Sequence, residues 1–297
     1  MNEAGDIPNS ESLELSGDRT GVLILHGFTG SPASIAPWAH FLHNEGFTVS
    51  APRIAGHGTT WSDLNSTTWQ DWYRSVEDSF VKLKSQCDQV FVAGFSAGGA
   101  LALHLSQLRG SEISGTILVN PSIYDERKIF WLVPLLSRII PSVKAGTSDV
   151  AKPNPPKHGY ERLPLRALAS LQKLWRRVEE DLYLVDLPLM VSYSLNDHVV
   201  SPLCSETIID NVFSMDIREV IFEKSFHNVA LDYDAEFLFE ESARFIDDVL
   251  TGEISRELEV SDEQDLINAE FESIIATLDM EPVVSAAPWW RKFFKRD

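Results

Sequence analysis

Short apolar runs alternate with longer segments of mixed polarity along most of the chain. The runs are rich in β-branched residues and lack regular polar alternation, which is typical of strands buried on both faces. The segments between them repeat apolar residues every three or four positions, as amphipathic helices do. The predicted strands are residues 21–25, 47–50, 89–93, 116–120, 189–193 and 218–222, with an edge strand near 13–15. The predicted helices are residues 33–46, 67–86, 97–109, 201–211 and 234–250.

This order of elements predicts an α/β fold in which a mostly parallel central sheet is flanked by helices. We assign the core to residues 21–121 and 187–250, preceded by a lead-in at 1–20. Residues 122–186 form too long a connection for an ordinary crossover, so we predict an insertion there. We expect its apolar run, residues 130–136, either to be buried or to line an acyl tunnel beside the site.

The tail, residues 251–297, differs from the rest of the chain in composition. Residues 253–281 hold ten acidic side chains and one basic one, whereas the last nine residues hold four aromatic and four basic side chains. Apolar residues within 260–279 follow helical spacing, which leaves a short amphipathic helix and a disordered acidic tail both open. For the aromatic and basic end we predict peripheral contact with an anionic membrane, or docking on the acidic body of the protein.

Composition excludes several classes of protein. The 297 residues carry 25 Lys and Arg against 44 Asp and Glu, and the net charge of −19 repels nucleic-acid backbones. Two cysteines cannot make a disulfide-rich scaffold. No metal-binding or nucleotide-binding motif is present, so we expect neither a metal nor a cofactor. No run of 18 apolar residues and no signal-peptide pattern occurs, so we expect a cytoplasmic protein.

The strongest chemical signal is the stretch Gly-Phe-Ser-Ala-Gly at residues 94–98. It follows a predicted strand and precedes a predicted helix, which is the setting of a nucleophile elbow. Small flanking residues allow the sharp turn that would expose Ser96 at its tip, over the positive end of the helix. Ser96 is therefore the candidate nucleophile.

A nucleophilic serine needs a base, and in this architecture the acid and the base follow it in that order. Outside the helix that follows the elbow, the downstream histidines are His158, His198 and His227. His227 comes shortly after the last predicted core strand and Asp197 shortly after the preceding one, so both would lie at the sheet edge that carries Ser96. We predict Asp197 as the acid and His227 as the base. Asp232 and Asp234 are rival acids, although they follow the histidine.

Acyl transfer also needs two backbone N–H groups that stabilise the oxyanion. One is expected from Ala97, the residue after the nucleophile, and the other from Phe28 in the loop after the first core strand. We expect Gly27 to adopt the unusual backbone conformation that turns the Phe28 N–H inward, and His26 to have a structural role.

Together these motifs resemble the α/β-hydrolase superfamily, and within it the bacterial carboxylesterase and monoacylglycerol lipase group. The resemblance spans about residues 20–250 and is carried by HGFTGSP at 26–32, GHGT at 56–59, TWQDW at 68–72, GFSAG at 94–98, NDHVV at 196–200 and HNVALDYD at 227–234. It implies that Ser96, Asp197 and His227 are the triad. It also implies that a small cap is inserted after the sixth strand. One departure is Ala97, where the group usually has Met.

The same resemblance suggests two residues of the insertion for substrate binding. Glu161 matches a cap glutamate that contacts the glycerol head group in monoacylglycerol lipases, and Val150 matches a cap isoleucine. The implied function is hydrolysis of small carboxylic esters or acylglycerols through an acyl-enzyme. A thioesterase or lactonase using the same triad, and a non-catalytic ligand-binding protein of the same fold, are the alternatives.

Overall fold

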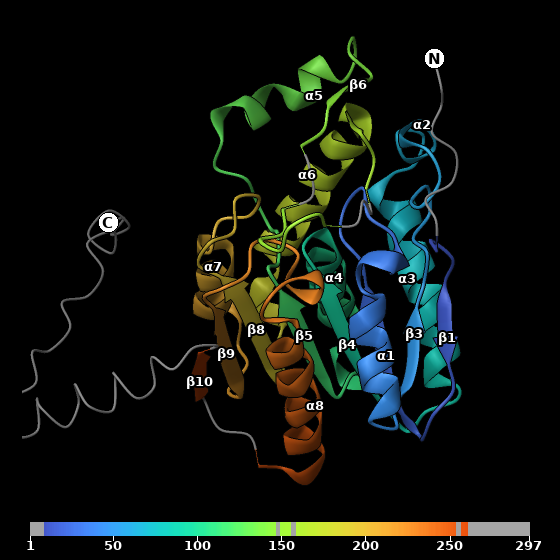
Figure 1. Ribbon diagram of the computed structural model, residues 1–297, viewed down its shortest axis with the longest axis vertical. Helices are drawn as coiled ribbons and strands as arrows, with labels where there is room; N and C mark the ends of the chain where they lie inside the picture. Colours follow the sequence, from blue (N-terminus) through green and yellow to red (C-terminus); the bar gives the residue numbers. More distant parts are fainter. Residues whose placement is uncertain (1–8, 147–148, 156–158, 254–256, 261–297) are drawn as a thin grey trace, which may run out of the picture. The chain divides into compact units, whose positions relative to one another are not determined.

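The computed structural model describes residues 9–146, 149–155, 159–253 and 257–260, and it confirms the predicted α/β fold. The central sheet has the order β1-β3-β2-β4-β5-β8-β9-β10, and all its neighbouring strands pair in parallel except β1 with β3 (Figure 1). Its strands are β1 Leu13–Leu15, β2 Thr20–Leu25, β3 Thr48–Ala51, β4 Gln89–Phe95, β5 Gly115–Val119, β8 Leu189–Ser194, β9 Ile217–Phe222 and β10 Glu257–Val260.

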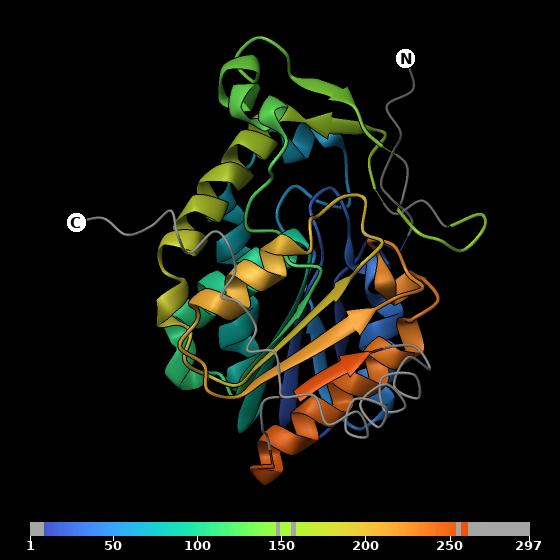
Figure 2. The same ribbon diagram turned by 90° about the vertical axis from the view of Figure 1, so that its left-hand side faces the viewer.

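Helices cover both faces of the sheet and enclose two apolar cores. The longer helices are α1 Ala36–Asn44, α3 Trp69–Lys84, α4 Ala97–Arg109, α6 Leu165–Glu180, α7 Leu203–Asn211 and α8 Ala235–Thr251. One core packs α3, α4 and α6 around buried Trp72 and Phe80, and the other packs α1 and α8 around buried Trp38 and Phe245. Figure 2 shows α6 (olive) and α8 (orange) on opposite sides of the sheet. Strands buried on both faces explain the continuous apolar runs in the sequence.

Several helices begin and end where local signals place them. Thr60 and Thr68 form capping boxes with the aspartates three residues later, and these start the helices at Trp61 and Trp69. The helix α8 ends at Gly252, whose φ of 77° is left-handed. The short helices are α2 Trp61–Leu64 and α5 Val133–Leu136, and the 3₁₀ turns are Pro32–Ser34, Gly110–Glu112, Lys128–Leu132, Leu182–Leu184 and Val229–Leu231.

The predicted insertion leaves the sheet after β5 and returns to it at β8. It contains a hairpin of β6 Ser142–Lys144 and β7 Arg162–Pro164, and then α6, which packs on α3 and α4. Among the described residues β5 is the fifth strand, because one antiparallel strand, β1, precedes β2. The insertion therefore follows the fifth described strand and not the sixth that we expected.

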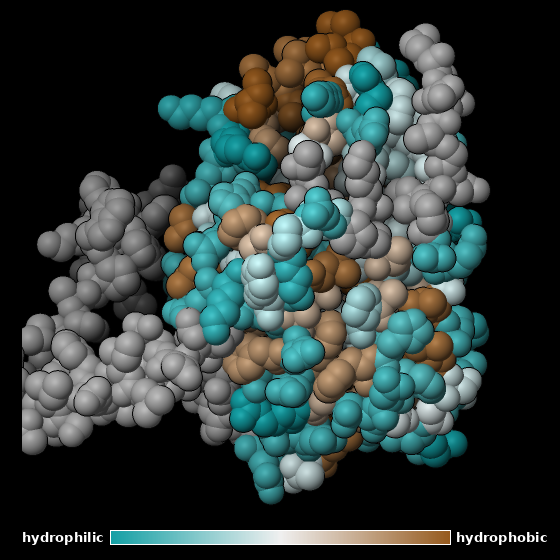
Figure 3. Space-filling model, viewed as in Figure 1, coloured by the Kyte–Doolittle hydropathy of each residue, from teal (hydrophilic) through white to brown (hydrophobic). Residues whose placement is uncertain are grey.

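The apolar run of the insertion is mostly neither buried nor part of a tunnel. Trp131 is 91% exposed, and its neighbours Leu132 and Leu135 are also exposed, whereas Val133 is buried. Figure 3 shows an apolar surface over α5. Of the run, Phe130 lines the cavity described below. A short 3₁₀ turn followed by one turn of helix is too small to bury every apolar residue that it carries.

The start of the predicted tail is ordered structure. β10 pairs in parallel with β9, from Glu257 beside Arg218 to Val260 beside Ile221. The predicted amphipathic helix and the aromatic and basic end lie outside the described residues. Among the residues that are described, no helix combines the length and the apolarity needed to cross a bilayer.

Candidate active site

Ser96 lies between β4 and α4 in a strained backbone conformation. Its φ is 56°, a value that non-glycine residues seldom adopt. Glycines on both sides make the turn sterically feasible. A Cβ on Gly94 would lie 2.4 Å from the Gly98 carbonyl oxygen, and one on Gly98 would lie 2.3 Å from the Leu25 carbonyl oxygen. The Gly-x-Ser-x-Gly spacing is therefore required by close contacts between strand and helix.

The structure brings Ser96, His227 and Asp197 into one hydrogen-bonded row. The Ser96 Oγ lies 3.0 Å from His227 Nε2, and His227 Nδ1 lies 2.6 Å from Asp197 Oδ2. The Asp197 side chain is only 1% exposed, and its Oδ1 accepts hydrogen bonds from the backbone N–H groups of Val199 and Val200. This geometry can pass a proton from the serine hydroxyl to the imidazole and hold the imidazolium beside a carboxylate.

Asn120 fixes the loop that carries His227, and sequence reasoning missed it. It follows β5 directly with a φ of 43°. Its Nδ2 donates to the His227 carbonyl oxygen over 2.6 Å, and its Oδ1 accepts from the Ser194 N–H over 2.8 Å. The side chain thus ties the base loop to the end of β8. The only signal for Asn120 in the sequence was its position as a polar residue at the carboxyl end of a buried strand.

Asp232 and Asp234, the rival acids, bind backbone groups. Asp232 is fully buried and accepts from the N–H groups of Ala151 (2.6 Å) and Phe226 (2.9 Å). Asp234 accepts from the N–H of Ser225 over 2.8 Å. Both carboxylates therefore shape the loop around the base, and Asp232 also anchors the insertion on it.

The two predicted oxyanion donors are free to bind an oxyanion. Within the described residues, neither the Phe28 N–H nor the Ala97 N–H donates a hydrogen bond, and both residues line the cavity in front of Ser96. The positive φ in this loop falls on Thr29, at 62°, so the expectation for Gly27 is wrong. Gly27 is needed for space instead, because a Cβ there would lie 3.2 Å from the Ser96 Cβ.

His26 and His57 are buried as neutral rings beneath this loop. The Nδ1–H of His26 donates to the Gly27 carbonyl oxygen, and its Nε2 accepts from the Ile54 N–H over 3.2 Å. Burial lowers the pKa of His26 to about 4, and burial with the neighbouring His26 lowers the pKa of His57 to about 3. His57 packs edge-on against the Phe28 ring, so both histidines support the oxyanion loop.

These two histidines predict a loss of stability in mild acid. In the unfolded chain both histidines bind a proton below about pH 6.5. In the folded protein His26 binds one only near pH 4 and His57 only near pH 3. Unfolding therefore takes up protons between pH 6.5 and these lower values. Each ring then lowers the free energy of unfolding by roughly 1.4 kcal/mol for every pH unit below 6.5. Urea unfolding of the parent and of His57→Gln at about pH 7 and 5 measures this, with exposed His40→Gln as control. An equal pH dependence in all three proteins would contradict the assignment.

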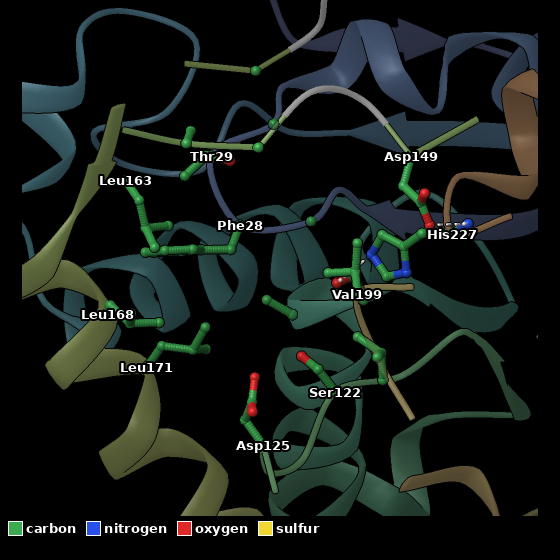
Figure 4. Close-up of a pocket in the computed structure, with 18 of the residues that line it drawn as sticks. Phe28, Thr29, Ser122, Asp125, Asp149, Leu163, Leu168, Leu171, Val199 and His227 are labelled. Atoms are coloured by element: carbon green, nitrogen blue, oxygen red, sulfur yellow. Dashed lines mark hydrogen bonds between the residues drawn. The ribbon is translucent and has the colours of Figure 1, made fainter. Parts of the chain in front are cut away.

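A cavity of about 580 Å³ opens in front of Ser96 and His227, beneath the insertion. Figure 4 shows Leu163, Leu168 and Leu171 on one side of it and Val199 and His227 on the other. Its apolar lining includes Phe28, Tyr124, Phe130, Leu163, Leu168, Leu171, Trp175, Val199 and Val200, and its charged lining includes Asp125, Arg127, Lys144 and Asp149. It can accept a small ligand that carries both apolar and polar groups.

The structure does not place the other candidate residues that it describes in the hydrogen-bonded row with Ser96. Glu161 is exposed and is not among the described residues that line the cavity, although Gly159 and Tyr160 are. Val150 is buried outside the lining. His198 is exposed and pairs with Asp149, and His158 lies outside the described residues. No group of three or more His, Cys, Asp or Glu side chains in the described part of the chain is placed to hold a metal.

Comparison with known proteins gives consistent relatives. The family model of the serine aminopeptidase S33 family matches residues 17–234. The chain is 32% identical over 239 residues to a thermostable monoacylglycerol lipase of Bacillus sp. (strain H-257), covering 76% of this chain and 89% of that one. It is 25% identical over 232 residues to a carboxylesterase of Bacillus subtilis (strain 168), covering 78% and 93%.

A solved structure reported for LipS and LipT, two metagenome-derived lipolytic enzymes, superposes with a TM-score of 0.79 and 30% sequence identity. The match covers 82% of this chain and 99% of that one. The family model covers well over half of the chain, and its span includes the elbow, the acid and base loops and the insertion. The chain belongs to the serine aminopeptidase S33 family of the α/β-hydrolase superfamily.

Proposed function

We propose that this protein is a serine hydrolase that cleaves carboxylic esters through an acyl-enzyme. The observation that carries the proposal is the hydrogen-bonded row from Ser96 Oγ through His227 to the buried Asp197, next to two unpaired backbone N–H groups. The relatives named monoacylglycerol lipase and carboxylesterase support this reaction class.

In the first half of the reaction, Ser96 Oγ attacks the ester carbonyl carbon while His227 Nε2 takes its proton. The carbonyl π pair moves to oxygen, where the N–H groups of Phe28 and Ala97 stabilise the negative charge. Asp197 keeps the proton of His227 on Nδ1, so that Nε2 is free to accept. The carbon–oxygen bond to the alcohol then breaks, and His227 returns the proton to the departing alkoxide.

In the second half, water replaces the alcohol. His227 takes a proton from the water as its oxygen attacks the acyl carbon, and the same two N–H groups stabilise the second oxyanion. Collapse releases the carboxylic acid, and the proton on His227 returns to Ser96 Oγ. The enzyme is regenerated without a metal or cofactor, because each charge that forms has a partner within the site.

The substrate that the cavity fits best is an ester with an apolar acyl chain. Its leucine, phenylalanine and valine lining favours a chain of several carbons over acetyl. We therefore propose a monoacylglycerol or a simple alkyl ester as the substrate. We also propose that Glu161 binds a glycerol head group. Thioesters and lactones use the same chemistry and are further outcomes of the test.

A panel of p-nitrophenyl esters and monoacylglycerols tests this substrate class. We expect kcat/KM to rise by at least roughly tenfold from acetyl to medium chains, because each buried CH₂ contributes about 0.8 kcal/mol and the burial of two already corresponds to about tenfold. Glu161→Ala is expected to reduce kcat/KM for glycerol esters and leave that for alkyl esters unchanged. Equal losses on both would remove Glu161 from the role, and a preference for thioesters or lactones would change the assigned substrate.

We also propose peripheral contact with an anionic lipid surface. The predicted contact through residues 289–296 lies outside the described residues, but the exposed face of the insertion adds support. It carries Trp131, Leu135 and Ile139 beside Lys128 and Arg138, a combination suited to an anionic interface. Co-sedimentation with anionic vesicles is expected to fall severalfold in Trp131→Ser while hydrolysis of soluble esters is unchanged. Equal sedimentation of both proteins would exclude this face.

A further inference from the structure

One acidic residue of the insertion, Asp149, contacts both loops that carry the partners of Ser96. Its Oδ2 accepts from the N–H groups of His227 and His198, each over 3.1 Å. Its Oδ1 lies 3.0 Å from His198 Nδ1, and its carbonyl oxygen accepts from the Asn228 N–H over 3.1 Å. Figure 4 shows Asp149 beside His227, with a dashed hydrogen bond between them.

This placement is specific to the base and the acid. His227 is the base itself, and His198 is the residue directly after the acid Asp197. A single carboxylate oxygen therefore receives one N–H from each loop and fixes the two loops relative to each other. The Asp149 side chain is only 17% exposed, so its charge is only partly screened by water.

We propose that Asp149 is a positioning residue for catalysis: it aligns the base with the acid and adds a second negative charge beside the imidazolium that forms during the reaction. This inference rests on the proposed function of Ser96, Asp197 and His227. It means that the insertion completes the catalytic geometry as well as enclosing the cavity.

The ionisable groups around His227 determine how a substitution at Asp149 changes the pH dependence of the reaction rate. Asp197 and Asp149 contact it from two different loops, His198 pairs with Asp149, and Asp125, Arg127 and Lys144 line the same cavity. Removing the charge of Asp149 leaves Asp197 as the carboxylate in contact with the ring. The imidazolium that forms during the reaction then loses part of its stabilisation.

Asparagine separates charge from shape at this position. Its side-chain oxygen can accept the same two backbone N–H groups, and its NH₂ can donate to His198 Nδ1. Alanine removes both the charge and the shared acceptor. Lys152→Ala is the matched control, because Lys152 Nζ anchors the same segment on the Asp232 carbonyl oxygen (2.8 Å) but forms no hydrogen bond with His198 or His227 in the described structure.

The experiment measures kcat, KM and the pH–rate profile of the four full-length proteins, normalised to the fraction that a fluorophosphonate labels. Asp149→Asn is expected to lower kcat about tenfold at unchanged KM and to move the acidic limb of the pH–rate profile. Asp149→Ala is expected to lower kcat about a hundredfold, because the base is also displaced. Lys152→Ala should keep the parent profile.

An unchanged acidic limb in Asp149→Asn, or the same loss in Lys152→Ala, would overturn the proposal and leave Asp149 as an anchor of the insertion. A parent enzyme that neither hydrolyses esters nor reacts with the fluorophosphonate would instead overturn the proposed function. The two failures are therefore distinguishable.

Discussion

Replacing Ser96 by alanine should abolish nearly all ester hydrolysis while the protein stays folded. The loss in kcat is expected to be roughly 10³-fold or more, because no other group can form the acyl-enzyme. The hydroxyl has one side-chain hydrogen bond, to His227, and alanine at a φ of 56° is no more strained than serine. Steady-state kinetics and thermal unfolding of the same preparation measure both parts of this expectation.

The matched control is Ser122→Ala. Ser122 lines the same cavity, and its Oγ accepts from the Trp175 indole N–H over 3.2 Å, but it does not contact His227. Its activity should stay within about tenfold of the parent. Near-normal hydrolysis by a properly folded Ser96→Ala protein would rule out the proposed mechanism.

Asp197→Asn is expected to lower kcat by about 10⁴-fold through the tautomer of His227. The N–H groups of Val199 and Val200 donate to Oδ1, so the asparagine oxygen will remain there. The NH₂ group then faces His227 Nδ1, which must become an acceptor. The ring proton moves to Nε2, and the base can no longer take the proton of Ser96.

Asp125→Asn serves as the control for Asp197. It removes the same charge from the wall of the same cavity, where the carboxylate pairs with Arg127. Its activity should change by less than about tenfold. An Asp197→Asn protein that hydrolyses esters as well as this control would show that Asp197 does not orient the base.

The parts of the site that could be predicted from sequence are those that depend on local constraints. The turn at Ser96 requires glycine at positions 94 and 98 because strand and helix touch there. Asp197 and His227 could be placed at the sheet edge that carries Ser96, because the carboxyl ends of parallel strands meet at one edge of the sheet. The core strands and helices could be predicted because strands buried on both faces and helices buried on one face each leave a regular pattern of apolar residues.

The parts that could not be predicted depend on long-range polar contacts. Asn120 binds a loop 107 residues away, and Asp149 binds one 78 residues away. Single polar residues in loops carry no periodic signal, so their partners become visible only in the folded chain. The positive φ at Thr29 could not be predicted either, because threonine seldom adopts such a φ and its residue type gives no signal of it.

The exposure of the apolar run at 130–136 could not be predicted from the sequence either. The apolar residues at 130–136 predicted either burial or an acyl tunnel, because most apolar runs of that length are covered. None of the described segments covers Trp131 and Leu135, which remain exposed. Composition reports how apolar a segment is, but not whether another segment packs on it.

The central claim is that His227 and Asp197 activate Ser96 as a nucleophile. Intact-mass measurement after treatment with a fluorophosphonate tests it most directly, because this reagent phosphonylates an activated serine. We predict one adduct per folded chain, located by peptide mapping on Ser96, and none on the urea-unfolded parent or on Ser96→Ala. Labelling at another residue, or equal labelling of folded and unfolded protein, would contradict the claim.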